Sequence, residues 1–137
     1  MHCLRLLLLI CLGLAPAACD RAFNPTDPDA GLHGCFAGSA NGKVLFRVTH
    51  EQAQPMAWFR EGDAWKTTPE PLEPSDGHHW FKEDFHALDS GLRSTDGRFA
   101  VFHIREGAAF KARPEDTGYI ALAMIGTRPV YKVVCPA

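Results

Sequence analysis

The sequence contains no cluster of lysines and arginines longer than one or two residues, and its 14 basic side chains face 16 acidic ones. Proteins that bind nucleic acids concentrate Lys and Arg on one surface, because much of their affinity comes from neutralising phosphates. The balance of charge therefore excludes this class, and we expect no nucleic-acid partner. The sequence also lacks an internal repeat of the length typical of solenoids.

Motifs for catalysis are missing as well. There is no G-x-S-x-G nucleophile elbow and no H-E-x-x-H zinc motif. The glycine-rich residues 38–42 join two predicted strands and do not open a helix, so they indicate a turn and not a phosphate-binding loop. No spacing of acidic residues singles out a carboxylate pair for sugar hydrolysis. We therefore expect neither an enzyme nor a cofactor, and we assign no catalytic residue.

The longest apolar run lies at the N-terminus and is too short to cross a membrane. It covers residues 6–12, follows one positive side chain at Arg5, and gives way at Pro16, whereas a transmembrane helix needs roughly 20 apolar residues. A short positive segment, an apolar core and a run of small residues are typical of a secretion signal. Residues 1–18 are therefore predicted to be a signal peptide.

The end of this signal resembles that of bacterial lipoproteins. Residues 12–19 (Leu-Gly-Leu-Ala-Pro-Ala-Ala-Cys) carry the resemblance, which implies that Cys19 is lipidated and becomes the first residue of the mature chain. The protein would then be anchored at the periplasmic face of the inner or outer membrane. Pro16 stands where lipoproteins usually carry Leu, Val or Ile. Cleavage after Ala17 or Ala18, which would give a soluble periplasmic protein, is therefore the alternative.

Two segments follow the signal. Residues 19–31 combine the candidate lipidated cysteine with Pro25, Pro28 and several aspartates, and contain one large apolar side chain, Phe23. This composition predicts a flexible tether, with a reach of up to roughly 40 Å if fully extended. Residues 32–137 are predicted to form one domain with a single core, since their length is close to the commonest domain size.

Cys35 and Cys135 are the cysteines left once the signal and the lipid site are set aside. In an oxidising compartment such a pair is expected to form a disulfide, which would join the beginning and the end of the domain. Two free thiols are the alternative. A zinc site is less favoured, since neither cysteine has a second ligand nearby in the sequence.

Short strands separated by turn signals are predicted along most of the domain. Residues 32–38 and 43–50 flank Asn41-Gly42, a dipeptide that favours the positive φ angles of a type I′ hairpin turn. Prolines at positions 69, 71 and 74 indicate a loop. Further strands are predicted at residues 56–60, 64–67, 99–104, 108–112, 119–125 and 130–135, with a turn at 126–129.

Residues 77–90 break this pattern and predict one short helix. Large apolar residues in and just after this segment recur at the spacing of one helix face: Trp80, Phe81, Phe85, Leu88 and Leu92. The successive hairpins predict a mainly-β domain, an antiparallel meander of seven or eight strands that forms a small barrel or a curved sheet. The alternative is an α+β fold in which the helix covers one face of the sheet.

The same segment contains possible metal ligands at residues 78–89. On a helix, His79, Glu83 and His86 would share one face, and imidazole together with carboxylate suits Zn²⁺ or Cu²⁺. A solvated polar face opposite the aromatic residues is the simpler interpretation. Metal binding in the cell envelope by this cluster is therefore the alternative function. His33 and His50, at the ends of predicted strands, give no such signal.

Aromatic residues around the proline loop give the main indication of function. Trp58, Trp65 and Trp80 form the candidate binding patch, because exposed aromatic rings near loops often contribute much of an interface's binding energy. Packing into the core is the competing interpretation. Together with the export signal, the patch predicts a lipid-anchored cell-envelope protein that binds a protein partner without catalysis, as inhibitor, immunity or accessory proteins do.

Overall fold

Alternating and continuous apolar segments form strands along much of the domain. The computed structural model describes residues 29–110, 117–123 and 126–136, where the regular structure consists of strands and two short 3-10 helices. The strands are β1 (Gly34–Ala37), β2 (Val44–Glu51), β3 (Gln54–Glu61), β4 (Ala64–Trp65), β5 (Glu70–Pro74), β6 (Leu88–Ser94), β7 (Ala100–Ile104), β8 (Tyr119–Ala123) and β9 (Gly126–Val133). The 3-10 helices are η2 (Ala30–Leu32) and η3 (Phe85–Ala87).

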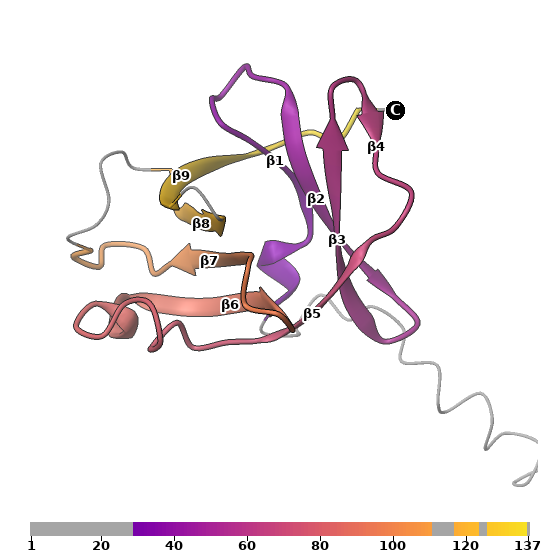
Figure 1. Cartoon of the computed structure of the whole chain (residues 1–137). Helices are drawn as coiled ribbons and strands as arrows, with labels where there is room; N and C mark the ends of the chain where they lie inside the picture. Colours follow the sequence, from indigo (N-terminus) through magenta and orange to yellow (C-terminus); the bar gives the residue numbers. More distant parts are fainter. Residues whose placement is uncertain (1–28, 111–116, 124–125, 137) are drawn as a thin grey trace, which may run out of the picture.

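The strands form an antiparallel sheet that closes into a barrel (Figure 1). Their order is β2-β1-β9-β8-β7-β6-β5-β3-β4, and the pairing of β2 with β3 closes the ring. Eight strands make up the barrel, while the short β4 pairs with β3 outside it. The predicted antiparallel, mainly-β fold is confirmed, and of its two predicted forms the protein adopts the small barrel.

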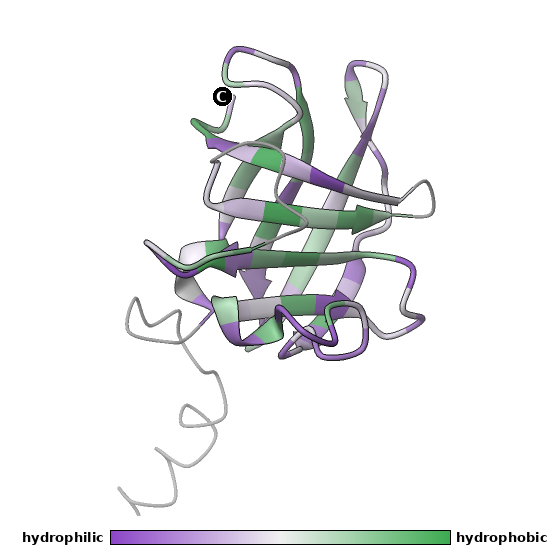
Figure 2. Cartoon of the chain, turned by 90° about the vertical axis from the view of Figure 1, so that its left-hand side faces the viewer, coloured by the Kyte–Doolittle hydropathy of each residue, from purple (hydrophilic) through white to green (hydrophobic). Residues whose placement is uncertain are grey.

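Side chains at alternate strand positions fill the interior of the barrel. In β2, Val44, Phe46 and Val48 are buried while Leu45 is exposed, as expected for a strand with one face on a core. Phe46 stacks on Phe36, with ring centres 5.0 Å apart. The complete interior cluster is Leu32, Phe36, Phe46, Val48, Ala57, Leu72, Leu92, Phe99, Val101, Ala121 and Val130. Figure 2 shows such hydrophobic stretches along the strands.

A second hydrophobic cluster covers the other face of β7. Its members from this strand, Ala100, Phe102 and Ile104, alternate with Val101, which belongs to the interior cluster. The other members are Phe81, Ala87, Leu88, Phe110 and Ile120. β7 is thus buried on both faces, as its continuous apolar sequence predicts.

The helix predicted at residues 77–90 is not present. The segment runs through turns and η3 before β6 begins. The Gly77 carbonyl, at a residue with a φ of 79°, accepts from the N–H groups of Trp80 (3.1 Å) and Phe81 (2.9 Å), and these turn hydrogen bonds do not continue into a regular helix. The apolar spacing reflects rings that pack on Phe102 from outside the barrel, with the ring centres of Trp80 and Phe81 at 5.8 and 5.7 Å from it. Aromatic residues are modest helix formers, so this packing determines the conformation. The alternative α+β arrangement depends on this helix and is also wrong.

Two strands occupy positions where the sequence predicts a loop and a helix. β5 contains Pro71 and Pro74 and pairs with β3 at only two positions, and β6 takes up the end of the predicted helix. Conversely, residues 108–110 of the predicted strand 108–112 are not in a strand, and the rest of it lies outside the described residues. The turn predicted at 126–129 is the first half of β9.

The hairpin turns also differ from prediction. The β1–β2 connection contains a hydrogen bond from Gly42 N to Ser39 O (3.1 Å), and neither Asn41 nor Gly42 has a positive φ. Positive φ angles occur instead at Gln52 (50°) and Ala53 (63°), which form the two-residue connection between β2 and β3. The type I′ geometry predicted for the first hairpin is thus found in the second.

A disulfide joins the beginning and the end of the barrel, as the two remaining cysteines predict. Cys35 in β1 and Cys135 after β9 are bonded, with Cα atoms 5.2 Å apart and a sequence separation of 100. Nearby, the Gly31 carbonyl accepts hydrogen bonds from Lys132 Nζ (2.8 Å) and Tyr119 Oη (3.3 Å). Gly31, predicted to lie in the tether, is therefore attached to the barrel. Residues 1–28, with the predicted signal and Cys19, lie outside the described residues.

Candidate functional site

Two arginines and two tryptophans stack on one another on the outer surface of β2, β3 and β4. Arg47 lies opposite Trp58 in the β2–β3 ladder, and Arg60 lies opposite Trp65 in the β3–β4 ladder. The Arg47 guanidinium carbon is 4.6 Å from the Trp65 ring centre and 5.3 Å from that of Trp58. The guanidinium carbon of Arg60 is 5.2 Å from the Trp65 ring centre. We call these four residues the arginine–tryptophan face.

The strand register explains why this face points away from the core. Phe46 and Phe59 are paired neighbours that contact the interior cluster. Since successive side chains alternate, Arg47 and Trp58 project outward. Trp58 and Trp65 belong to neither hydrophobic cluster and are half-buried. Both rings therefore lie outside the hydrophobic core and are in contact with the arginine guanidinium groups.

Arg47 differs from its neighbour in its hydrogen bonding. Arg60 donates from Nη2 to the Asp63 carbonyl (2.6 Å), whereas the Arg47 side chain makes no hydrogen bond or ion pair with any residue in the described ranges, and its Nε is buried. A guanidinium carries five N–H donors and cannot lose its charge in a protein. Arg47 is thus a fixed cation whose donors have no acceptor from the described part of the chain.

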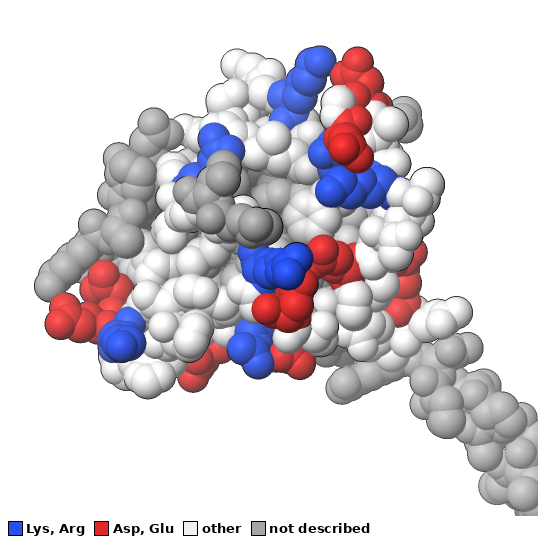
Figure 3. Space-filling model, viewed as in Figure 1, with Lys and Arg blue, Asp and Glu red and all other residues white. Residues whose placement is uncertain are grey.

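The arginine–tryptophan face is held by several contacts around it. Trp58 Nε1 lies 3.2 Å from both Thr49 Oγ1 and Glu51 Oε2, to which it can donate. On the opposite side, Arg47 pairs in the β1–β2 ladder with Cys35, the half-cystine of β1. These contacts restrict both the ring and the backbone beneath it. In Figure 3 positive and negative groups lie close together on the visible surface, without a patch of one sign.

The structure divides the predicted binding patch. Trp58 and Trp65 lie together, but Trp80 packs against Phe102 in the second hydrophobic cluster. Trp80 is therefore part of the covering of β7, as the competing core interpretation predicts. Sequence reasoning also missed Arg47 and Arg60, since their stacking depends on strand pairing that the sequence does not display.

A cavity of about 1090 Å³ opens in the barrel wall between β3 and the β5–β6 pair. The β3–β5 ladder includes Met56 and Ala57 and ends before Pro55. Proline has no N–H to donate, so Pro55, Pro71 and Pro74 limit the hydrogen bonding between these strands. Residues lining the cavity include Gln54, Pro55, Leu72, Pro74, Ser90 and Gly91. The segment predicted to be a proline loop therefore forms a strand, β5, that pairs with β3 at only two positions.

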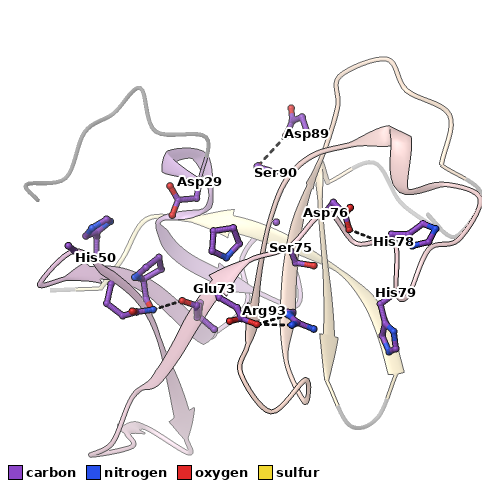
Figure 4. A pocket seen from close by; sticks show the side chains of 16 residues that line it. Asp29, His50, Glu73, Ser75, Asp76, His78, His79, Asp89, Ser90 and Arg93 are labelled. Atoms are coloured by element: carbon purple, nitrogen blue, oxygen red, sulfur yellow. Dashed lines mark hydrogen bonds and ion pairs between the residues drawn. The ribbon is translucent and has the colours of Figure 1, made fainter.

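Charged and imidazole groups surround this cavity. Glu73 and Arg93 form an ion pair in its wall, with Oε1 and Nη2 2.7 Å apart. In Figure 4, Asp29 and His50 lie on one side of this pair, and His78 and His79 lie on the other. The cavity can therefore accommodate a small polar ligand or an ion.

The predicted ligands His79, Glu83 and His86 do not share a helix face, because no helix forms at residues 77–90. Within the described ranges, a different group has ligand atoms that all lie within 4.8 Å of one another: Asp29, His33 and His50. His33 Nε2 is 3.7 Å from Asp29 Oδ2. The rings of His33 and His50 meet edge to face, with centres 5.4 Å apart.

This group of three residues was not predicted, although the sequence contains two indications of it. His50 continues the inward-facing alternation of Val44, Phe46 and Val48 in β2. Asp29 and His33 are four residues apart, the spacing that brings side chains together across one helical turn. Their proximity to His50 is a long-range contact between η2 and the end of β2, which the local sequence does not display.

A second histidine–carboxylate pair lies where β6 meets β7. His103 Nδ1 and Asp89 Oδ1 are 2.7 Å apart, and Ser90 Oγ donates to the same carboxylate oxygen (3.1 Å). The serine hydroxyl therefore does not donate to the imidazole, as an activated nucleophile would. Burial, and to a lesser degree the charge of Asp89, raises the pKa of the neighbouring Tyr119.

No helix within residues 29–110, 117–123 or 126–136 is long and apolar enough to cross a bilayer. Comparison with protein-family models, with curated proteins and with solved structures finds no match for this chain.

Proposed function

We propose that this chain is a lipid-anchored cell-envelope protein that acts by binding a protein partner through the arginine–tryptophan face. The observation that carries the proposal is Arg47, a half-buried cation held between Trp58 and Trp65 without an acceptor among the described residues. Its chemistry fits a carboxylate, so the partner would present an Asp or Glu side chain, or its own C-terminus, to Arg47.

The composition of the face supports this proposal. Trp and Arg are the residue types enriched among those that contribute most to interface energies. Stacking and hydrogen bonds already restrict Arg47, Trp58 and Trp65, so binding would immobilise few additional rotamers. Leu45, which is 38% exposed and points to the same side of β2, extends the face with an apolar side chain. Inhibitor, immunity or accessory proteins act in this way, without chemistry of their own.

Anchoring gives the face a defined location. Lipidation at Cys19 would hold the barrel at the envelope through the predicted tether, so that the partner would be another periplasmic or membrane protein. In a host that processes lipoproteins, Cys19→Ser is expected to move the chain from the membrane fraction to the soluble fraction. Recovery of the variant in the membrane fraction would contradict lipid anchoring without affecting the proposal for the face.

The test for partner binding compares single substitutions on the mature chain. Wild-type protein is used to capture and identify a partner from envelope extract, and affinities are then measured with the purified partner. Arg47→Gln and Trp65→Ala should each weaken binding by roughly 30-fold or more, equivalent to about 2 kcal/mol. Raising the salt concentration should weaken the wild-type complex more than the Arg47→Gln complex.

Arg98→Gln is the matched control, because Arg98 is exposed, lies in the β6–β7 turn and pairs with Asp96, outside the strands that carry the face. It should leave the affinity unchanged. Thermal unfolding of each variant separates loss of binding from loss of folding. A partner bound equally well by Arg47→Gln, Trp65→Ala and wild type would show that this face is not the interface.

A further inference from the structure

We propose that Asp29, His33 and His50 form a binding site for a divalent transition-metal ion such as Zn²⁺ or Cu²⁺. The site lies apart from the arginine–tryptophan face and does not depend on the proposed partner. It also differs from the cluster at residues 78–89 that the sequence suggested. Two imidazoles and one carboxylate form a donor set that suits Zn²⁺, Cu²⁺, Ni²⁺ or Fe²⁺.

The distances are close to those of a metal centre. In a tetrahedral zinc site with bonds of about 2.0–2.2 Å, ligand atoms lie roughly 3.3–3.6 Å apart. His33 Nε2 and Asp29 Oδ2 are already 3.7 Å apart, and all three ligand atoms lie within 4.8 Å of one another. Closure onto an ion therefore requires side-chain movements of about 1.5 Å or less, which small rotations of the side chains provide.

The backbone that carries the ligands is fixed by the fold. Asp29 and His33 flank η2, whose Leu32 is fully buried in the interior cluster and donates its N–H to the Asp29 carbonyl (2.9 Å). His50 is the last inward-facing residue of β2 and pairs with Pro55 of β3. The three side chains thus come from two segments that the barrel holds in place, so little order has to be created when an ion binds.

The surroundings leave one side of the site open. The side chains of His33 and Asp29 are 12% and 18% exposed, so these ligands are largely withdrawn from water. The attraction between an ion and a carboxylate is stronger in such surroundings than in bulk water. Asp29 and His50 also line the cavity of about 1090 Å³. Three protein ligands beside a cavity leave a fourth position for water or an external ligand, an arrangement known from zinc sites that are not purely structural.

The nature of the donors excludes the other common divalent ions. Ca²⁺ and Mg²⁺ prefer sites built from oxygen donors, whereas Asp29 is the one oxygen donor in this group of three. Zn²⁺ is therefore the probe of choice. Co²⁺ serves as a spectroscopic substitute, because its visible absorption differs between tetrahedral and octahedral coordination.

The experiment uses the mature chain purified without a polyhistidine tag, stripped with EDTA and titrated with Zn²⁺ against a chromogenic chelator. We expect one equivalent of Zn²⁺ per chain. His50→Gln and His33→Gln should each weaken binding about 100-fold or more and abolish the tetrahedral Co²⁺ spectrum. His79→Gln, which changes an exposed histidine on the other side of the cavity, is the matched control and should bind like wild type.

Asp29→Asn is a second test in case the histidine variants fold poorly. Asn has the same shape as Asp, and Asp29 lies at the edge of the domain, so this variant is expected to fold normally. Its metal-free form should unfold at the wild-type temperature, and its affinity for Zn²⁺ should fall about tenfold. Wild-type affinity in both His50→Gln and Asp29→Asn would overturn the proposal. The same conclusion follows if wild type fails to bind Zn²⁺ at micromolar concentration, or if His79→Gln abolishes binding.

Discussion

Ser94 is a polar residue buried at the end of β6, and its hydroxyl organises the turn that leads to β7. Its Oγ donates to Asp96 Oδ1 (2.7 Å) and accepts a hydrogen bond from the Phe99 N–H (3.0 Å). The backbone N–H of Arg98 donates to the same carboxylate oxygen (3.0 Å). These hydrogen bonds lower the pKa of Asp96, and the Ser94 hydroxyl is the largest cause.

Ser94→Ala is therefore expected to raise the pKa of Asp96 toward its usual value of 3.8. It should also reduce the free energy of unfolding at neutral pH by about 1–3 kcal/mol, because the buried Phe99 N–H loses its acceptor. Titration of the Asp96 carboxyl carbon by NMR measures the first effect, and urea unfolding measures the second. An Asp96 pKa that is the same in Ser94→Ala and wild type would contradict the assignment of the hydroxyl as its main cause.

The direction of the pH dependence follows from the lowered pKa. Because the folded protein favours the carboxylate form of Asp96, its contribution to stability is fully present above the unfolded pKa. The contribution is lost as the pH falls through the folded pKa. Between the unfolded and the folded pKa of Asp96, the free energy of unfolding of wild type should therefore decrease with falling pH. Ser94→Ala should remove much of the decrease that is due to Asp96.

The candidate site shows how far single residues can be predicted from sequence. Trp58 and Trp65 could be selected because tryptophan is enriched among the residues that contribute most to binding energy. Arg47 could not, because its significance depends on lying opposite Trp58 in a neighbouring strand and below Trp65 in a third. The same limit applies to His50, which meets Asp29 only after the barrel has closed.

At the level of elements, the connection between β2 and β3 combines an unfavourable backbone conformation with residues that do not favour it. Gln52 and Ala53 both have positive φ angles, a conformation that costs non-glycine residues roughly 1–2 kcal/mol each. Two-residue hairpin turns of this kind favour Asn-Gly. The substitutions Gln52→Asn and Ala53→Gly together should therefore raise the free energy of unfolding by about 1 kcal/mol, as measured by urea unfolding.

Ala40→Gly provides the matched control in the β1–β2 connection. Ala40 is exposed and does not have a positive φ, so glycine there only makes the unfolded chain more flexible. We expect this substitution to lower the free energy of unfolding by roughly 0.5–1 kcal/mol. If the doubly substituted β2–β3 turn is instead less stable than wild type, relief of backbone strain is not the dominant effect of the change.

Secondary-structure elements were predictable where local pattern and long-range packing agree. β2 and β7 follow from their alternating and continuous apolar sequences. The segment at 77–90 was misread because rings spaced for a helix face also suit a loop that covers Phe102. β5 was missed because its prolines suggest a loop, although a strand with few ladder hydrogen bonds accommodates them.

For the whole molecule, the sequence favoured a closed arrangement through Cys35 and Cys135. Their predicted bond brings the first and last strands together, and the structure shows β1 and β9 paired at three positions. Closure of the other side, by pairing of β2 with β3, follows from the second hairpin. Two features could not be inferred from the sequence: the position of β4 outside the barrel, and the cavity between β3 and the β5–β6 pair. Both depend on how the strands curve in three dimensions.

Removal of the disulfide tests how much the covalent closure contributes beyond the hydrogen-bonded ladder. Its loop has a sequence separation of 100, and loss of such a crosslink is expected to lower the free energy of unfolding by about 2–5 kcal/mol. The Cys35→Ala and Cys135→Ala double variant should therefore unfold at a lower urea concentration than wild type, and a reducing agent should lower only the wild-type midpoint. Since β1 remains paired with β9, the variant should retain its β-sheet circular dichroism at low temperature and its arginine–tryptophan face.

Equal stability of the double variant and oxidised wild type would mean that the hydrogen-bonded β1–β9 ladder closes the barrel without help from the disulfide.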